Sequence, residues 1–402
     1  MTDWGLLDPG AADASGSDDD AALAAMVEVE RALLLAWGSV LDEVLDAQAD
    51  TLEAAALDRD ALRDGVARDG VPVVALVPAL RAQLEAAGLS ADRLHLGATS
   101  QDVVDTALML VAREALRAAR GSLVAAGGSL ATLADAHRGD VRIARSIARH
   151  GEASTLGVLA AGWLDGVTSA VAAIDALAFP VQFGGAVGTG AAADAAAGRP
   201  TGADEVRREL AGRLGLADPG RSWHAERTPV LAVAGAAATV LAALGRIAGD
   251  ATFLSREEIG EVRLAASGGS SAMPHKQNPV DAVRITAAAT EAPGLLSVVA
   301  SAAIAGDERS PGRWHAEWSA LRRLVRLARS SAGAAARLVG GLGFDAVRAA
   351  AIVADAGPAG ERPARDVLAA ASDRIVDRAV SRFGGVADPT GPAASAPQEA
   401  RP

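Results

Sequence analysis

Residues 268–279 read GGSSAMPHKQNP, and this stretch contains the only lysine and the only asparagine of the 402-residue chain, Lys276 and Asn278. Every other permanently cationic side chain is an arginine. A lysine ammonium is a compact charge on a flexible stem, which the planar guanidinium of arginine does not replace. We therefore expect this stretch to carry the chemistry of the protein. The alternative is a Gly/Ser/Pro loop that holds rare residues by chance.

The composition favours an all-α fold. Hydrophobic residues make up 50% of the chain, whereas aromatic residues make up only 3% and tyrosine is absent. Alanine is abundant and loses the least entropy in a helix, while strands favour β-branched and aromatic residues. Apolar residues recur with a helical period at about 20–49, 50–66, 74–88, 103–133, 154–178, 229–261, 279–305, 316–339 and 362–383. No strand of useful length is expected.

The expected organisation has three helical parts and a tail. Residues 1–97 form an N-terminal helical region, 98–340 a central bundle of long helices, and 341–384 a reduced C-terminal helical region. Residues 385–402 are rich in Pro, Ala and Ser and are expected to be disordered. The signature loop, residues 266–279, lies between two long helices of the central bundle. No linker divides these parts, so one continuous body is expected.

Charge and residue types exclude several classes of function. The net charge of −12 opposes binding to nucleic acid or anionic membranes, and the absence of cysteine excludes disulfides and thiolate chemistry. No His/Glu pair has metal-ligand spacing, so a metal site is not expected. The acidic N-terminus is the reverse of a signal peptide, and no charge-free apolar run of about 18 residues is expected. These features predict a soluble, cytoplasmic protein.

The stretch resembles the signature of the fumarase/aspartase superfamily, Gly-Ser-Ser-x-Met-Pro-x-Lys-x-Asn-Pro, whose fixed positions are all matched within residues 269–279. Two more blocks, residues 97–106 and 182–189, resemble the Thr-Ser-x-Asp block and the glycine-rich turn of the same enzymes. The blocks at 223–224 and 312–318 are most similar to those of bacterial 3-carboxy-cis,cis-muconate cycloisomerases. The resemblance implies an all-α, three-part fumarase/aspartase-type fold, in which four central bundles form a tetrameric helical core.

The resemblance, which covers about residues 5–340, implies an enzyme that moves a proton beside a carboxylate while a group leaves or adds at the next carbon. A dianionic aci-carboxylate intermediate needs a proton shuttle and dense positive charge. The implied catalytic residues are Ser270, Lys276, Ser146 and His150. The implied substrate-binding residues are Thr99, Ser100, Gln101, Met273, Asn278, Arg309 and Arg313. The substrate is then a small anionic polycarboxylate, no cofactor is needed, and three subunits of a homotetramer share each site.

Within this set, Ser270 is the implied proton shuttle, and Lys276 would favour its alkoxide form. Lys276 and Asn278 would also hold the carboxylate on which charge accumulates. Thr99 and Ser100, at a helix N-terminus, suit a second carboxylate because N–H groups and the helix dipole face it. Other interpretations remain open, with a helix cap for Thr99 and Ser100, surface charges for Arg309 and Arg313, and a structural histidine for His150.

The chain departs from the superfamily pattern near Ser146. Ile147 stands where adenylosuccinate and argininosuccinate lyases carry His, which disfavours these two activities, and Arg149 stands where Gln is usual. Three functions are compared. The expected one is a cycloisomerase that converts 3-carboxy-cis,cis-muconate to 4-carboxymuconolactone. The others are a related lyase that expels an amine or another group from a succinate-like substrate, and a non-catalytic helical assembly, which the intact signature stretch disfavours.

Overall fold

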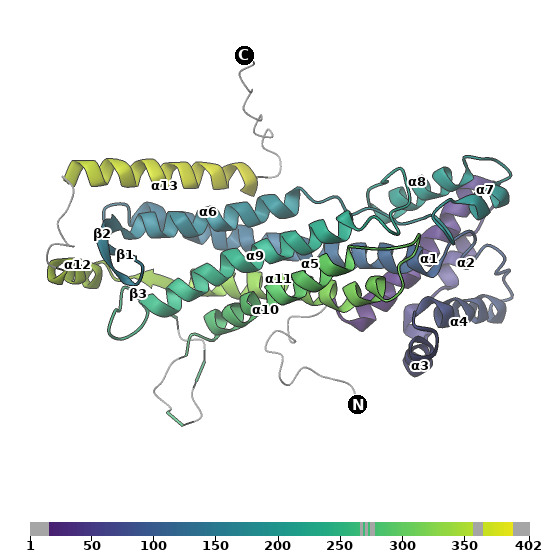
Figure 1. Cartoon of the computed structure of the whole chain (residues 1–402), viewed down its shortest axis with the longest axis horizontal. Helices are drawn as coiled ribbons and strands as arrows, with labels where there is room; N and C mark the ends of the chain where they lie inside the picture. Colours follow the sequence, from purple (N-terminus) through teal and green to yellow (C-terminus); the bar gives the residue numbers. More distant parts are fainter. Residues whose placement is uncertain (1–15, 266–267, 270–271, 274–277, 357–364, 389–402) are drawn as a thin grey trace, which may run out of the picture.

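The computed structural model describes residues 16–265, 268–269, 272–273, 278–356 and 365–388. Within these residues the chain is built almost entirely of helices, so the prediction of an all-α fold is confirmed. Figure 1 shows an elongated molecule in which the longest helices run side by side along the long axis. Shorter elements gather at the two ends of this bundle.

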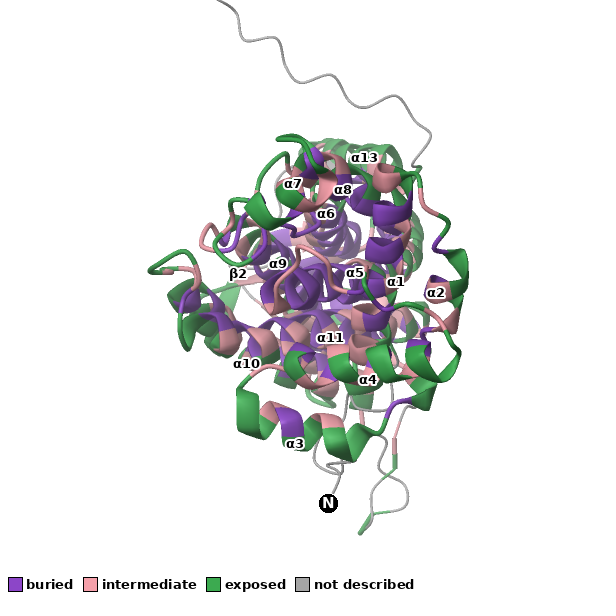
Figure 2. Cartoon of the chain, turned by 90° about the vertical axis from the view of Figure 1, so that its right-hand side faces the viewer, coloured by how far each residue is buried: buried purple, intermediate pink, exposed green. Residues whose placement is uncertain are grey.

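Five long helices of the described chain form the central bundle: α5 (Ser100–Ala136), α6 (Leu156–Asp175), α9 (Thr228–Leu254), α10 (Val280–Ala302) and α11 (Arg313–Gly340). α5 packs on α6 and α11, while α9 packs on α6, α10 and α11. Their inner faces share one buried apolar cluster, seen as the central purple region of Figure 2. The helices predicted at these positions are confirmed, although α9 ends several residues before the predicted end.

α5 runs the length of the bundle because nothing in its sequence interrupts it. No proline occurs from Thr99 to Ala136, and the Asp102 carboxylate accepts a hydrogen bond from the Thr99 N–H at 2.9 Å, as in a capping box. With a rise of about 1.5 Å per residue, this 37-residue helix is about 55 Å long. Residues at its two ends are therefore far apart within one chain.

Other helices surround the end of the bundle at which α5 begins. They are α1 (Asp19–Leu41), α2 (Asp46–Thr51), the 3-10 turn η2 (Ala54–Ala56), α3 (Arg59–Asp69), α4 (Val73–Ala86), α7 (Ala191–Ala197) and α8 (Gly202–Leu214). The prediction of one helix over 20–49 is wrong, because Asp42 adopts a left-handed φ of 58° and its N–H bonds to the Gly38 carbonyl. The helix predicted at 50–66 begins later, after Asp58, whose side chain caps it.

Two helices complete the chain near the opposite end of the bundle. α12 (Ala346–Asp355) contacts β1, and α13 (Arg365–Ala387) lies along α6 (Figure 1). Gly127 of α5 permits this approach, because a Cβ at that position would lie 2.2 Å from the Phe383 ring. The helix continues past 385, where the tail was predicted to begin. Residues 389–402 lie outside the described part of the chain.

No strand of useful length was expected, and the described residues contain only short strands, of three to seven residues. β1 (Val141–Ser146) pairs antiparallel with β2 (Arg149–Thr155), and β3 (Val262–Leu264) pairs antiparallel with β4 (Leu342–Phe344). In strands this short, too few residues are present for the alternation of polar and apolar side chains to be recognised beside long apolar helices. Both pairs lie at the end of the bundle where α5 finishes.

Three of the described helices, α6, α9 and α10, are long and apolar enough to cross a membrane by length and composition alone. The stretch from Thr228 to Gly245 carries no charged residue, so the expectation that no such run exists is wrong. Within the chain, the apolar windows of α6 and α9 are 56% and 50% buried, whereas that of α10 is only 28% buried. α10 therefore presents apolar surface that one chain does not cover, including Val283 and Val298.

Candidate active site

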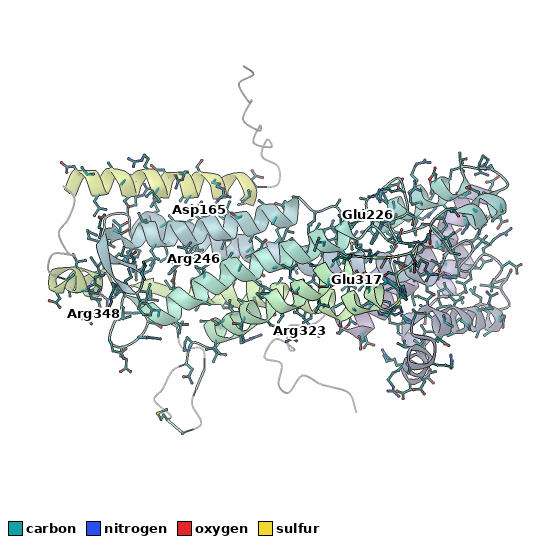
Figure 3. The ribbon with its side chains drawn as sticks, in the orientation of Figure 1. Asp165, Glu226, Arg246, Glu317, Arg323 and Arg348 are labelled. Carbon is teal, nitrogen blue, oxygen red and sulfur yellow. The ribbon has the colours of Figure 1, made fainter. Side chains whose placement is uncertain are left out.

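The structure separates the predicted site residues into two groups at opposite ends of the bundle. Thr99 precedes α5 and Ser146 follows it, so about 55 Å of helix lies between them. In Figure 3, Glu317, near the start of α11, marks one end of the bundle, and Arg348, on α12, marks the other. One group consists of Thr99, Ser100, Gln101, Arg309 and Arg313, and the other of Ser146, His150 and Asn278. Among the described residues, no contact places Met273 with either group. One chain does not bring the two groups together.

The first group surrounds the N-terminus of α5. Thr99 and Ser100 are half-buried at this end. The first backbone N–H groups of a helix lack intrahelical partners, and the positive end of the helix dipole adds to their attraction for an anion. The position has features that suit a carboxylate, although the Thr99 N–H itself is used by Asp102, and carboxylate binding here stays a prediction.

Asp102 joins two other segments to the start of α5. Its carboxylate accepts hydrogen bonds from the Gly184 and Gly185 N–H groups, both at 3.0 Å, and it bonds to His224 Nε2 at 2.7 Å. His224 is only 3% exposed, and its Nδ1 has no hydrogen-bond partner within the described residues. The glycine-rich turn predicted at 182–189 is thus fixed against the proposed anion-binding end of α5.

A buried charge cluster lies directly behind this helix end. Arg227 is 3% exposed and pairs with the carboxylates of Asp105, at 2.8 Å, and Glu317. Burial raises the pKa of Glu317 to about 7, because loss of water outweighs the attraction of Arg227 and because Asp105 adds repulsion. Trp314 Nε1 also donates to Asp105, at 2.9 Å. The cluster fixes α5, α11 and the start of α9 relative to one another.

Gln101 connects this charge cluster to Arg309. Its side chain is fully buried, and its amide NH₂ group donates to Asp105 Oδ2 at 3.2 Å and to the His224 carbonyl at 3.0 Å. Its amide oxygen accepts a hydrogen bond from Arg309 Nε at 3.4 Å. The Arg309 guanidinium also lies over the Trp314 ring, 6.0 Å from its centroid. Both the nitrogen and the oxygen of the Gln101 side-chain amide therefore have protein partners, and the hydrogen bond to the oxygen positions Arg309.

Arg313 and His315 lie on the outer side of the same end. Arg313 is exposed and donates to the Ser301 carbonyl at 2.8 Å, which joins the start of α11 to the end of α10. His315 packs edge-on against the Trp314 ring, with 5.0 Å between the ring centroids. Burial, together with the positive charge of Arg309, lowers the pKa of His315. The His315 imidazole is therefore neutral at pH 7.

The second group is built on the hairpin of β1 and β2. Glu261 is completely buried and accepts hydrogen bonds from Arg142 and Arg145, each at 3.1 Å, which ties the hairpin to the segment before β3. The strand register is irregular between Ile143 and Arg145. At this bulge two residues of β2, Gly151 and Glu152, lie opposite one residue of β1, Ala144. The hairpin is thereby held firmly at its base.

Ser146 and His150 lie at the free end of this hairpin and are exposed. Ser146 pairs with Arg149, and His150 pairs with Arg145. Because successive residues of a strand point to opposite faces, Ser146 and His150 face opposite sides of the hairpin. The structure therefore brings Ser146 together with Arg149 rather than with His150.

The signature loop is closed at its base by Asn278. The Asn278 N–H donates to the Gly268 carbonyl at 2.8 Å, and Asn278 Nδ2 donates to the Gly269 carbonyl at 2.9 Å. A Cβ at Gly268 would lie 2.2 Å from Val280 Cγ2, so this approach requires glycine. Met273 is 42% exposed. Ser270 and Lys276 lie outside the described residues, and their roles remain predictions.

Sequence reasoning did not assign roles to Asp102, Asp105, Arg227 or Glu317. The sequence did contain a clue in Asp102 and Asp105, which lie three residues apart on one face of α5 among apolar residues. Charged side chains on a buried helical face require partners, and this requirement predicts a compensating arginine.

In the described part of the chain, no group of three His, Asp or Glu side chains could hold a metal ion. A metal-free site stays a prediction.

Residues 23–294 match a family model described as lyase. The chain is 39% identical over 409 residues to nitrosuccinate lyase of Streptomyces davaonensis, an alignment that covers 95% of this chain and 86% of that protein. It is also 39% identical over 295 residues to 3-carboxy-cis,cis-muconate cycloisomerase of Pseudomonas aeruginosa, covering 72% of this chain and 63% of that protein.

The crystal structure of the 3-carboxy-cis,cis-muconate lactonizing enzyme from Pseudomonas putida is similar to this fold. It matches with a TM-score of 0.75 and 31% sequence identity, over 92% of this chain and 86% of that chain. The family model spans most of the sequence, and the fold matches that crystal structure over 92% of this chain. The chain belongs to the lyase family and is an enzyme of the fumarase/aspartase superfamily.

Proposed function

We propose that the chain is a cycloisomerase that converts 3-carboxy-cis,cis-muconate to 4-carboxymuconolactone. One carboxylate of the substrate adds across the substrate's own double bond, and the carbon beside another carboxylate is protonated through an aci-carboxylate intermediate. The similarity to the muconate cycloisomerase of Pseudomonas aeruginosa and to the lactonizing enzyme of Pseudomonas putida supports this reaction.

Ile147 is the observation that carries the proposal. Its side chain is 96% exposed at the tip of the hairpin, next to Ser146, and it neither donates nor accepts a proton. An amine leaves only when it is protonated, so its expulsion requires a general acid near the leaving group. A carboxylate adds or leaves as a stable anion. The hairpin tip therefore supports carboxylate addition over the expulsion of an amine.

The proposed roles of the signature loop follow the predicted ones. Ser270 transfers the proton, and Lys276 and Asn278 hold the carboxylate on which charge accumulates. A positive charge and hydrogen-bond donors placed in advance stabilise such an intermediate without reorganisation during the reaction. The hydrogen bonds from Asn278 to Gly268 and Gly269 support this arrangement because they fix both ends of the loop.

We further propose that the site is completed only in a homotetramer. The two groups of site residues lie at opposite ends of α5, so a complete site requires the second group from other copies. The uncovered apolar surface of α10, with Val283 57% exposed and Val298 42% exposed, supports an interface between copies. Particle mass in solution tests the assembly. A monomer of 40.2 kDa with full activity would contradict a shared site.

A second candidate function is the elimination of nitrite from nitrosuccinate. The 39% identity to nitrosuccinate lyase extends over 95% of this chain, a longer match than that to the Pseudomonas aeruginosa cycloisomerase. A nitro substituent departs as nitrite, which is a stable anion like a carboxylate. The apolar Ile147 at the hairpin tip is therefore compatible with this reaction too.

The two candidates are separated by assays on the purified protein. Loss of the conjugated diene absorbance of 3-carboxy-cis,cis-muconate reports lactone formation, and release of nitrite with fumarate reports the elimination. We expect kcat/KM for the muconate to exceed that for nitrosuccinate by about 100-fold or more, within the range that enzymes reach between related substrates. The reverse ratio would establish the second candidate. Rapid release of fumarate from a succinyl amine would contradict both.

A further inference from the structure

The tip of the β1–β2 hairpin is a strained turn. Ser146 pairs with Arg149, so Ile147 and Ala148 form a two-residue connection. Both have left-handed φ values, 49° and 60°. Turns of this kind normally carry Asn-Gly, because a left-handed conformation costs other residues about 1–2 kcal/mol each. Such strain is typical of functional sites, where the surrounding structure holds a particular side-chain placement.

This turn places Arg149 beside Ser146 on the exposed face of the hairpin. Arg145, one position earlier than Ser146, points the other way and bonds to Glu261 at 3.1 Å. Near its tip the hairpin thus directs Arg145 to the buried Glu261 and Arg149 to the outside, because neighbouring strand residues alternate in direction. Ser146 and Arg149 are both exposed.

The Arg149 guanidinium has no hydrogen bond or ion pair with any side chain that the structure describes. The arginines of the facing strand β1, Arg142 and Arg145, are both paired with Glu261. In a chain with a net charge of −12, an anionic substrate is repelled by the whole protein and needs local cations. Arg149 offers such a cation in a fork that matches a carboxylate.

We propose that Arg149 binds one carboxylate of the substrate and makes the site selective for tricarboxylates over dicarboxylates. The proposal rests on the proposed function, in which the hairpin tip contributes to the site. The signature loop and the N-terminus of α5 each suit one carboxylate, so an independent cation beside Ser146 fits a third. Glutamine is usual at this position in the superfamily, and its amide donates a neutral hydrogen bond. Arg149 instead carries a positive charge and a second donor.

The test measures binding to the full-length protein, with propane-1,2,3-tricarboxylate and succinate as probes. The variants are Arg149→Gln and Arg149→Lys, and the control is Arg378→Gln, which removes the same charge from an exposed position on α13. A charge-assisted hydrogen bond is worth roughly 10- to 100-fold in affinity. We expect Arg149→Gln to weaken tricarboxylate binding by roughly that factor while succinate binding changes less than about twofold. Arg149→Lys should retain part of the selectivity, because it keeps the charge but loses the fork.

The outcomes distinguish this inference from the proposed function. Equal weakening of both probes, or no weakening in Arg149→Gln, overturns the role of Arg149, and so does an equal effect of Arg378→Gln. If the wild type does not convert the muconate but Arg149→Gln still loses tricarboxylate binding selectively, the cycloisomerase fails and the inference stands. Unchanged melting temperatures show that the affinity changes do not arise from unfolding.

Discussion

Arg227 and Glu317 form an ion pair inside the bundle, and both side chains are almost completely removed from water. Asp105 shares the same guanidinium at 2.8 Å. Two buried carboxylates on one cation leave a net negative charge when both are ionised. The raised pKa of Glu317, about 7, follows from this arrangement.

The first prediction concerns the pH dependence of stability. The pKa of Glu317 is raised from 4.5 to about 7, so between these pH values the folded protein keeps a proton that the unfolded chain releases. The free energy of unfolding therefore falls as pH rises from about 4.5 to 7, by roughly 2–3 kcal/mol from this group. We expect Glu317→Gln to lose this part of the slope.

Denaturant unfolding at pH 5 and pH 8, at one fixed protein concentration, measures the difference between wild type and Glu317→Gln. Fixed concentration matters because assembly contributes to apparent stability. If the free energy of unfolding changes with pH by the same amount in wild type and Glu317→Gln, Glu317 is ionised throughout this range.

The second prediction concerns the arginine of the same cluster. Arg227→Met leaves Asp105 and Glu317 buried without a counter-charge, which costs about 3–5 kcal/mol of stability. The matched control is Arg246→Met on α9, because the Arg246 side chain is 60% exposed and lies 3.9 Å from Asp250. That change should cost less than about 1 kcal/mol. Similar melting temperatures for the two variants would mean that the buried cluster is not needed to hold the helices together.

The third prediction tests the base of the signature loop. A Cβ at Gly268 would meet Val280 Cγ2 at 2.2 Å, whereas a Cβ at Gly269 has nothing within 4 Å among the described residues. We expect Gly268→Ala to lower kcat by about 100-fold, because a displacement of about 1 Å in an active site has that effect. Gly269→Ala should stay within a few-fold of wild type. Equal kcat values for Gly268→Ala and Gly269→Ala would show that the base of the signature loop does not affect catalysis.

The fourth prediction concerns the solitary lysine. Lys276→Arg keeps the positive charge, so a role in solubility alone predicts no effect on turnover. As a point charge beside the reacting carboxylate, Lys276 is not replaced by a bulkier planar group, and we expect kcat to fall on the order of 100-fold. The rate under saturating substrate is compared with that of wild type, with the melting temperature as control. Ser270→Ala should lose at least as much activity while the assembly persists.

The starts of the long helices could be predicted because their signals are local. Thr99 and Asp102 form the cap of α5, and Thr228 with Pro229 marks the start of α9. The end of α1 could not be predicted from periodicity, because the apolar pattern continues past Asp42 while the backbone turns left-handed there. The β1–β2 hairpin was missed because its turn residues, Ile147 and Ala148, lack the usual turn chemistry.

The candidate site could be predicted in part. The signature residues stand out by their rarity in the chain, and the block around Thr99 by its interruption of a helical pattern. The charge cluster around Arg227 depends on contacts between residues far apart in the sequence, such as the pair with Asp105, over 122 positions. No local pattern specifies such a pairing. The placement of Ser146 beside Arg149 likewise follows from a turn and not from periodicity.

The length of α5 has a genetic consequence. Because one chain contributes Thr99 and Ser146 to opposite ends, a damaging change at one end leaves the other end of the same polypeptide intact. In the proposed shared-site assembly, a cell that expresses two different inactive alleles, one altered at each end, would assemble some sites from two undamaged halves. Two null alleles could then complement each other, whereas two alleles altered at the same end could not.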